Sequence, residues 1–152
     1  MKKKLAVVWF FLFMNGLWAQ SSAVLDGIIE NPSINWSQGA YLVLVGSGQL
    51  VDSASPQQGY EQLSQLGWIP FFTGPDTPIN LSDYCYLLAR IWSVKGGFFY
   101  TALPSSRYAY REFKFQGYAS SGTDPSAAVS GAEAIRMLGK VMDSNPAVGA
   151  KK

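Results

Sequence analysis

The sequence contains no histidine, and Cys85 is its only cysteine. The absence of histidine excludes a Ser–His–Asp triad and a Cys–His dyad, because both use an imidazole as general base. A zinc site built from cysteine and histidine and a haem-attachment motif are excluded for the same reason, and one cysteine cannot form an intramolecular disulfide. The classes that remain are a carboxylate- or lysine-based enzyme, a ligand-binding module and a structural protein.

Charged residues are also scarce, at 14% of the 152 residues, whereas apolar residues make up 48%. A chain of this length and apolar content is expected to form one domain with a packed core, in which Cys85 is an inert thiol. Six acids and no base lie between Gln20 and Ala89, whereas nine bases and four acids lie between Arg90 and Lys152. This segregation can steer an anionic partner toward the C-terminal half.

The N-terminus has the layout of a secretory signal peptide. Lys2–Lys4 form a basic segment, residues 5–13 are apolar, and a cleavage point is expected before Gln20. The apolar run is interrupted at Asn15, short of the roughly 20 residues that span a bilayer. We therefore expect residues 1–19 to be a signal peptide rather than a retained anchor. The mature chain would then be exported to the periplasm or cell envelope, with no stable membrane span.

An internal repeat organises the sequence after this segment. Residues 60–92 align with residues 110–142 without a gap at an offset of 50, and residues 34–45 match residues 79–90 at an offset of 45. A period of this size is typical of repeat proteins. The predicted domain covers residues 20–144, with units at about 34–50 (partial), 58–93 and 107–143, and a flexible tail at 145–152.

Each unit has the pattern of a helix, a glycine-terminated turn, a proline-containing loop and a second, capped helix. Gly67 and Gly117 follow the first helices and suit a left-handed C-cap. Capping-box spacing begins the second helices, at Asn80 with Asp83 and at Ser130 with Glu133. In the partial unit, Tyr41–Val45 is also compatible with a buried strand, but the repeat favours a helix. The sequence therefore predicts a mainly α fold, a bundle of two to three helix–loop–helix repeats.

The units also resemble a known family. An aromatic–x–x–Leu–x–x–x–Gly pattern, then a Pro/Gly loop, then Ile/Val–Thr–Arg–Ala–Glu and a Leu-rich helix, is the pattern of the S-layer homology (SLH) domain. Residues 59–92 and 109–142 resemble two such units, and residues 34–45 resemble the closing helix of a third. The resemblance implies a pseudo-threefold helical bundle whose grooves hold cell-wall polysaccharide, and hence an envelope-anchoring role.

The Thr–Arg–Ala–Glu motif is altered in all three units. The arginine that contacts the anionic glycan in that family is replaced by Trp36, Leu81 and Gly131. The acid is kept as Asp83 and Glu133, but capping explains both without a ligand. The resemblance therefore implies the family's fold more strongly than its glycan chemistry.

Two groups of residues are candidates for ligand binding. Helical spacing places Arg107, Arg111 and Lys114 on one face, where they could hold an anionic glycan, a phosphate polymer or an acidic protein surface. The alternative is a solvated face partly paired with neighbouring acids. Trp68 and Tyr118 follow the two cap glycines and could stack on sugar rings, although we expect both to pack back onto the bundle.

Two connecting segments, Trp68–Phe72 and Gly96–Tyr100, are unusually apolar for loops. They either cover the ends of the bundle or form a docking patch on its surface. We expect them to be buried.

No catalytic residue, metal site or cofactor is expected. Asp83 and Glu133 are the natural pair for a two-carboxylate glycosidase, but their capping positions occupy both with backbone amides. Neither a nucleophile-elbow motif nor a phosphate-loop motif is present in the sequence.

The sequence thus predicts an exported, non-catalytic cell-envelope protein that binds peptidoglycan or an anionic cell-wall polymer. The alternative is a structural or accessory protein that docks onto another envelope protein through its apolar loops, without binding glycan. Nucleic acid is not an expected partner, because without the signal lysines the chain has nine bases against ten acids. Self-association could complete the partial unit.

Overall fold

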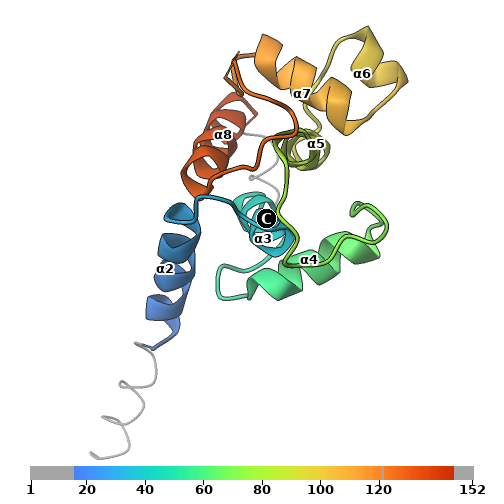
Figure 1. Ribbon diagram of the computed structural model, residues 1–152. Coiled ribbons are helices and arrows are strands. Elements are labelled where there is room, and N and C mark those ends of the chain that lie inside the picture. Colours follow the sequence, from blue (N-terminus) through green and yellow to red (C-terminus); the bar gives the residue numbers. More distant parts are fainter. Residues whose placement is uncertain (1–15, 121, 146–152) are drawn as a thin grey trace, which may run out of the picture.

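The structure is a computed structural model that describes residues 16–120 and 122–145 (Figure 1). Most of the predicted signal peptide, and the predicted tail from residue 146 on, lie outside the described residues. The described residues form seven helices and no β-strand, so the predicted mainly α fold is confirmed. None of these helices is both long enough and apolar enough to cross a bilayer.

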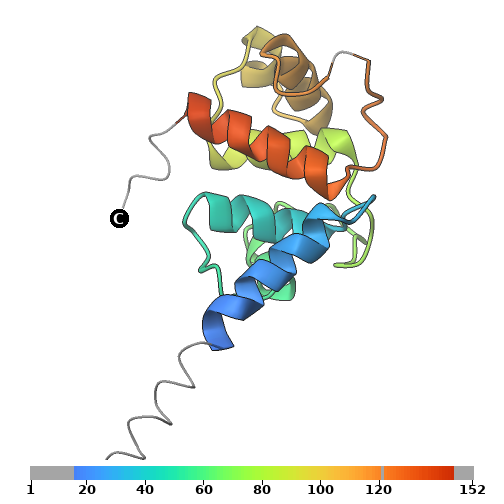
Figure 2. The same ribbon diagram turned by 90° about the vertical axis from the view of Figure 1, so that its left-hand side faces the viewer.

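Three central helices carry most of the core, and three others pack against them one by one (Figures 1 and 2). The central helices are α3 (Trp36–Gly46), α5 (Leu81–Ile91) and α8 (Gly131–Ser144). On these pack α4 (Pro56–Gln65), α7 (Ser106–Phe115) and α2 (Gly16–Ile29), in that order, while α6 (Phe98–Ala102) packs on α7.

Two sequence predictions on element type have opposite outcomes. Tyr41–Val45 lies inside α3, so the prediction of a helix rather than a strand is confirmed. The segment Gly96–Tyr100 was expected to be a turn, but its last three residues begin the short helix α6. A backbone hydrogen bond from Leu103 to Phe99 closes this helix.

Side-chain caps explain where the central helices begin. The Asn35 side chain accepts a hydrogen bond from the Gln38 backbone N–H, and the Gln38 side chain accepts one from the Asn35 backbone N–H. The two bonds form a complete capping box at α3. At α5 and α8 the caps Asn80 and Ser130 accept the N–H groups of the third helical residues, at 2.8 and 3.3 Å.

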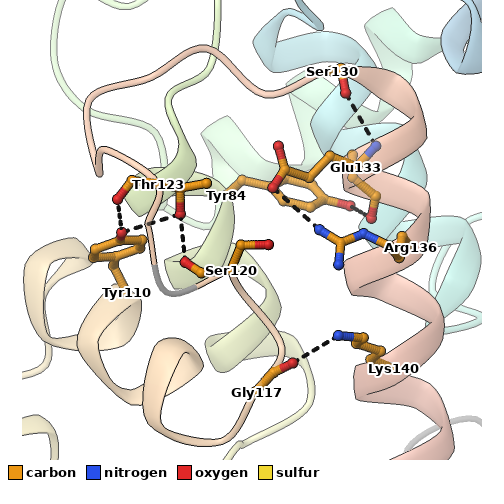
Figure 3. Close-up of polar contacts among 10 residues, drawn as sticks. Tyr84, Tyr110, Gly117, Ser120, Thr123, Ser130, Glu133, Arg136 and Lys140 are labelled. Carbon is orange, nitrogen blue, oxygen red and sulfur yellow. Dashed lines mark hydrogen bonds and ion pairs between the residues drawn. The ribbon is translucent and has the colours of Figure 1, made fainter.

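The return half of the predicted box is missing at α5 and α8. The Asp83 carboxylate accepts a hydrogen bond from the Asn80 side-chain amide instead, at 2.8 Å. Glu133 forms an ion pair with Arg136 at 3.4 Å (Figure 3). Both carboxylates therefore bind side chains, and not the backbone amides that were expected from their capping positions.

A ring of backbone hydrogen bonds joins the starts of the three central helices. The N–H of Ile34 donates to Val129 (2.8 Å), that of Ile79 to Ile34 (3.0 Å) and that of Val129 to Ile79 (3.4 Å). All three side chains are fully buried. Three equivalent bonds in a closed ring give the bundle a pseudo-threefold axis. The ring closes within one chain.

Loop carbonyls occupy the first N–H group of each central helix. The N–H groups of Trp36, Leu81 and Gly131 donate to the carbonyls of Thr77, Ala127 and Asn31, at 3.0, 2.9 and 2.9 Å. The loop before one central helix thus caps the start of a neighbouring one. Unpaired N–H groups at a helix start can bind anions, but these three are already used.

Positions aligned at the offset of 50 make matching contacts. The Tyr60 hydroxyl donates to the Thr73 carbonyl, and the Tyr110 hydroxyl donates to the Thr123 carbonyl (Figure 3). Each bond ties the outer helix to the loop that leads into the next central helix. The α4–α5 and α7–α8 segments therefore share a framework of contacts.

Candidate functional site

The three positions that lack the motif arginine are core positions. Trp36 and Leu81 are buried at the starts of α3 and α5. At Gly131 a Cβ atom would lie 1.6 Å from the Ile28 carbonyl oxygen, because the end of α2 passes directly against the start of α8. None of these positions can present a side chain to a ligand.

The two candidate aromatic residues sit at helix ends of the same type. Gly67 and Gly117 have φ values of 68° and 77°, the left-handed conformation predicted for a glycine C-cap. The next residue in each case donates its N–H back to the helix, Trp68 to Leu63 at 3.1 Å and Tyr118 to Phe113 at 2.8 Å. These bonds form a Schellman motif, which directs the residue after the glycine back over its own helix.

Trp68 and Tyr118 nevertheless differ in their surroundings. Tyr118 is buried edge-on against Phe113, with ring centroids 5.2 Å apart, and offers no stacking surface. Trp68 is half-buried, and the Arg90 guanidinium covers its ring. Of the two, only Trp68 lies near a surface that a ligand could reach.

Arg90, at the end of α5, lies over two aromatic rings. Its guanidinium carbon is 4.6 Å from the centroid of the Trp68 ring and 5.5 Å from that of Tyr86. It also donates a hydrogen bond of 3.0 Å to the Tyr86 hydroxyl. Cation–π contacts of this kind orient a guanidinium without neutralising it. Arg90 remains exposed and forms no ion pair with another residue of the described part of the chain.

An open pocket of about 510 Å³ lies beside Arg90, between the end of α5 and α6. We refer to it as the Arg90 pocket; Lys95, Tyr100 and Thr101 also line it. Burial raises the pKa of Tyr100, as does the nearby Tyr86, while Arg90 lowers it. The Tyr100 hydroxyl therefore stays protonated at neutral pH and can act as a donor. Two cations, a hydroxyl and the aromatic ring of Tyr100 together suit an anionic sugar.

The basic residues predicted on one helix face lie on α7. Arg107 and Arg111 are exposed, and the Lys114 amino group lies 5.5 Å from the centroid of the Tyr110 ring. The alternative of pairing with Glu112 is not found, because that carboxylate accepts hydrogen bonds from a backbone N–H and a glutamine amide instead. None of the three cations is ion-paired among residues 16–120 and 122–145.

The expectation that the apolar segments are buried is wrong for most of their residues. Only Trp68, Ile69 and Tyr100 pack against the core. The large apolar side chains that remain exposed are Phe71, Phe72, Phe98 and Phe99. The helices already fill the core, so the outer half of each segment has no cavity to enter. Phe72 also has a φ of 63°, a conformation that few bulky residues adopt.

The remaining reactive or metal-binding side chains of the described residues form no second candidate site. Cys85 is fully buried, and burial raises the pKa of its thiol, which keeps it protonated and inert. The described residues contain no group of three or more side chains able to hold a metal ion.

Sequence reasoning missed Arg90 as a site residue. In the repeat, Arg90 aligns with Lys140, a residue of the same charge. The two side chains make different contacts in the structure. Lys140 donates a hydrogen bond of 2.8 Å to the Gly117 carbonyl (Figure 3). Arg90 instead lies on the larger ring of Trp68. The available signal was a pair of differences between the repeats: Arg90 aligns with Lys140, and Trp68 aligns with Tyr118.

Comparisons with known proteins add no relative. No family model matches the chain, and neither curated proteins nor solved structures give a match. The candidate site therefore depends on the geometry of this chain alone.

Proposed function

We propose that this protein is an exported, non-catalytic cell-envelope protein with an SLH-like bundle that binds an anionic cell-wall polymer in the Arg90 pocket. The observation that carries the proposal is the guanidinium of Arg90, held over Trp68 and Tyr86, exposed, and without a carboxylate partner in the described chain. The secretory layout of the N-terminus supports an envelope location.

The framework supports the SLH-like part of the proposal. A pseudo-threefold ring of backbone hydrogen bonds is what a bundle of three such units requires, and Ile34, Ile79 and Val129 form one. The matching tyrosine contacts of the α4–α5 and α7–α8 segments are a second, independent similarity between units.

The chemistry of the pocket fits a charged glycan. Arg90 can donate two parallel hydrogen bonds to a carboxylate or phosphate, and Lys95 supplies a second positive charge at the same pocket. The ring of Tyr100 offers apolar surface for a sugar face, while the Trp68 ring supports the Arg90 guanidinium from outside the pocket lining. Because Trp36, Leu81 and Gly131 are core positions, polymer binding in this chain would have moved from the starts of the central helices to the end of α5.

Co-sedimentation with purified cell-wall sacculi tests the proposal. The core of the described structure runs from Ile28 to Val141, so a purified chain beginning at Gln20 retains it. We expect binding at low salt that falls at least tenfold in Arg90→Gln or in high salt. The matched control is Lys140→Gln, which removes a cation at the aligned position that is held by a backbone carbonyl. Absence of binding at low salt, or equal losses in both variants, would reject the proposal.

A second candidate function is docking onto another envelope protein. The observation that favours it is the exposure of Phe71 and Phe72 at the end of the segment after α4. In that case the protein fails to bind sacculi, and Phe71→Ser with Phe72→Ser abolishes a salt-resistant complex in envelope extracts.

A further inference from the structure

A second surface combines exposed aromatic rings with cations that have no acidic partner. It consists of α6, the residue that follows it and the outer side of α7, and we call it the α6–α7 face. In Figure 1 these helices lie at the upper edge of the molecule, away from α2 and α4. The residues that define it are Phe98, Phe99, Leu103, Arg107, Arg111 and Phe115.

The aromatic side chains of this face project into solvent, and two of them, Phe98 and Phe99, contact each other rather than the core. Phe98, Phe99 and Phe115 are 80%, 61% and 88% exposed. Phe99 stacks on Tyr108, with centroids 5.9 Å apart and planes 11° apart, and Phe98 meets Phe99 edge-on at 5.8 Å. These contacts hold the rings in place while leaving their outer surfaces uncovered. Large apolar side chains gathered in this way mark an interaction surface.

Only a small hollow lies among the rings of this face. Phe98, Phe99, Arg111 and Phe115 surround a depression of about 190 Å³. This volume is below the range that usually holds a small-molecule ligand. A protein partner would need a concave surface matched to the projecting rings, whereas a bilayer interface adapts to any projection.

Basic residues outnumber acidic ones in this part of the chain, although Glu112 lines the depression beside Arg111. Residues 90–123 contain five basic residues and a single acid, Glu112. The Glu112 carboxylate is already bound, at 2.9 Å, to the backbone N–H of Gly97. Arg107 and Arg111 lie four residues apart on α7 and have no carboxylate partner among the described residues. Net positive charge beside projecting rings complements an anionic lipid surface.

We propose that the α6–α7 face docks the protein onto the surface of an anionic lipid bilayer. The phenyl rings of Phe98, Phe99 and Phe115 enter the interfacial layer, and Arg107 and Arg111 pair with lipid phosphates. Basic residues near an anionic surface are attracted to it, and burial of the phenyl area in the interface adds to the binding. The α6–α7 face adjoins the Arg90 pocket, because Tyr100 of α6 lines both the pocket and the depression between the rings.

Vesicle flotation tests this proposal with the chain that begins at Gln20. The vesicles are pure phosphatidylcholine, or phosphatidylcholine with 30% phosphatidylglycerol as the anionic lipid. We expect flotation with the anionic vesicles only, reduced at least fivefold in Phe115→Ser and in Arg107→Gln with Arg111→Gln. The matched control is Phe71→Ser with Phe72→Ser, which removes two even more exposed rings from a segment without basic residues. This control should float within twofold of the unmodified protein.

Three results would overturn the proposal. One is no flotation with anionic vesicles at low salt. Another is flotation that Phe115→Ser leaves unchanged, which indicates charge attraction without insertion of rings. The third is an equal loss in the Phe71 and Phe72 control, which indicates non-specific apolar adhesion. Sacculus binding by Phe115→Ser is measured in parallel, because its retention shows that the variant is folded and separates this proposal from the preceding one.

Discussion

The α4–α5 and α7–α8 segments share a backbone framework but fill it differently. In both, a tyrosine on the outer helix binds the carbonyl of an aligned threonine, and a left-handed glycine ends that helix. Where α4 packs on α3, however, it presents Gly59 and Leu63, whereas α7 presents Ala109 and Phe113 to α5. A few local contacts thus set the framework, and side-chain volume then adjusts the spacing of each helix pair.

The central helices also differ in side-chain volume at aligned positions near the pseudo-threefold axis. Aligned positions on α3, α5 and α8 hold Gly39, Tyr84 and Ala134. The Tyr84 ring is fully buried and its hydroxyl donates to the Ala134 carbonyl at 3.1 Å (Figure 3). A Cβ atom on Gly39 would lie 3.7 Å from that ring. One large residue therefore fills space that two small ones leave, and the pseudo-symmetry of the backbone does not extend to the core.

Surface residues differ even more between the segments, and the proposed functions depend on that difference. Arg90 lies exposed over Trp68, whereas the aligned Lys140 is bound to a carbonyl. The α7 side carries the phenyl rings and cations of the α6–α7 face. The proposed polymer site thus lies in one segment and the proposed lipid-facing surface at the start of the other.

The largest effect that we predict comes from a substitution at Gly131, where the backbones of α2 and α8 lie against each other. Gly131→Ala places a methyl group against the Ile28 carbonyl, so α2 must move away from α8 or the Gly131 hydrogen bond to Asn31 must break. We expect a loss of about 3 kcal/mol in the free energy of unfolding, measured by urea denaturation.

The matched control for this prediction lies in the same helix. Gly139 aligns with Ala89 of α5, and an added Cβ there has no atom within 4 Å. Gly139→Ala should stabilise the protein by about 0.5–1 kcal/mol through helix propensity alone. A mild effect at position 131, similar to that at 139, would show that α2 does not pack on α8 as described.

Several of these features were predictable from sequence because they depend on local chemistry. The caps at Asn80 and Ser130 and the turns at Gly67 and Gly117 follow from preferences of one or two residues. The exposure of the phenylalanines was not predictable, because it depends on whether the helices leave room in the core. Gly131 gave no local signal either, since its role arises from a segment about 100 residues earlier in the chain.

The same substitution at Gly59 tests the difference between the outer helices. An added Cβ would lie 2.9 Å from the Tyr41 backbone nitrogen, so α4 would have to move away from α3. Helix propensity alone predicts that Gly59→Ala is stabilising by about 1 kcal/mol. We instead expect destabilisation by about 2 kcal/mol, because overpacking outweighs propensity. A stabilised variant in urea denaturation would show that α3 and α4 are spaced like α5 and α7.

The smallest loss of stability that we predict depends on pH and comes mainly from α5. Burial raises the pKa of the Cys85 thiol above its ordinary value of 9.0. The unfolded chain therefore loses this proton as the pH rises past 9, while the folded chain keeps it. The free energy of unfolding is fully retained below pH 9 and falls above it, by about 1.4 kcal/mol at pH 10.

Cys85→Ala identifies the group responsible, because the aligned positions are Ala40 on α3 and Ile135 on α8 and neither titrates. Burial also raises the pKa of Tyr84, in the same direction, but the unfolded tyrosine ionises only near 10.0. Tyr41 and Tyr100 act in the same direction as Tyr84, because burial raises the pKa of each. Between pH 9 and 10 the free energy of unfolding, measured by urea denaturation, should therefore fall for both proteins, and more steeply for the unmodified protein than for Cys85→Ala. Equal slopes would mean that the thiol is not buried and that α5 packs differently against its neighbours.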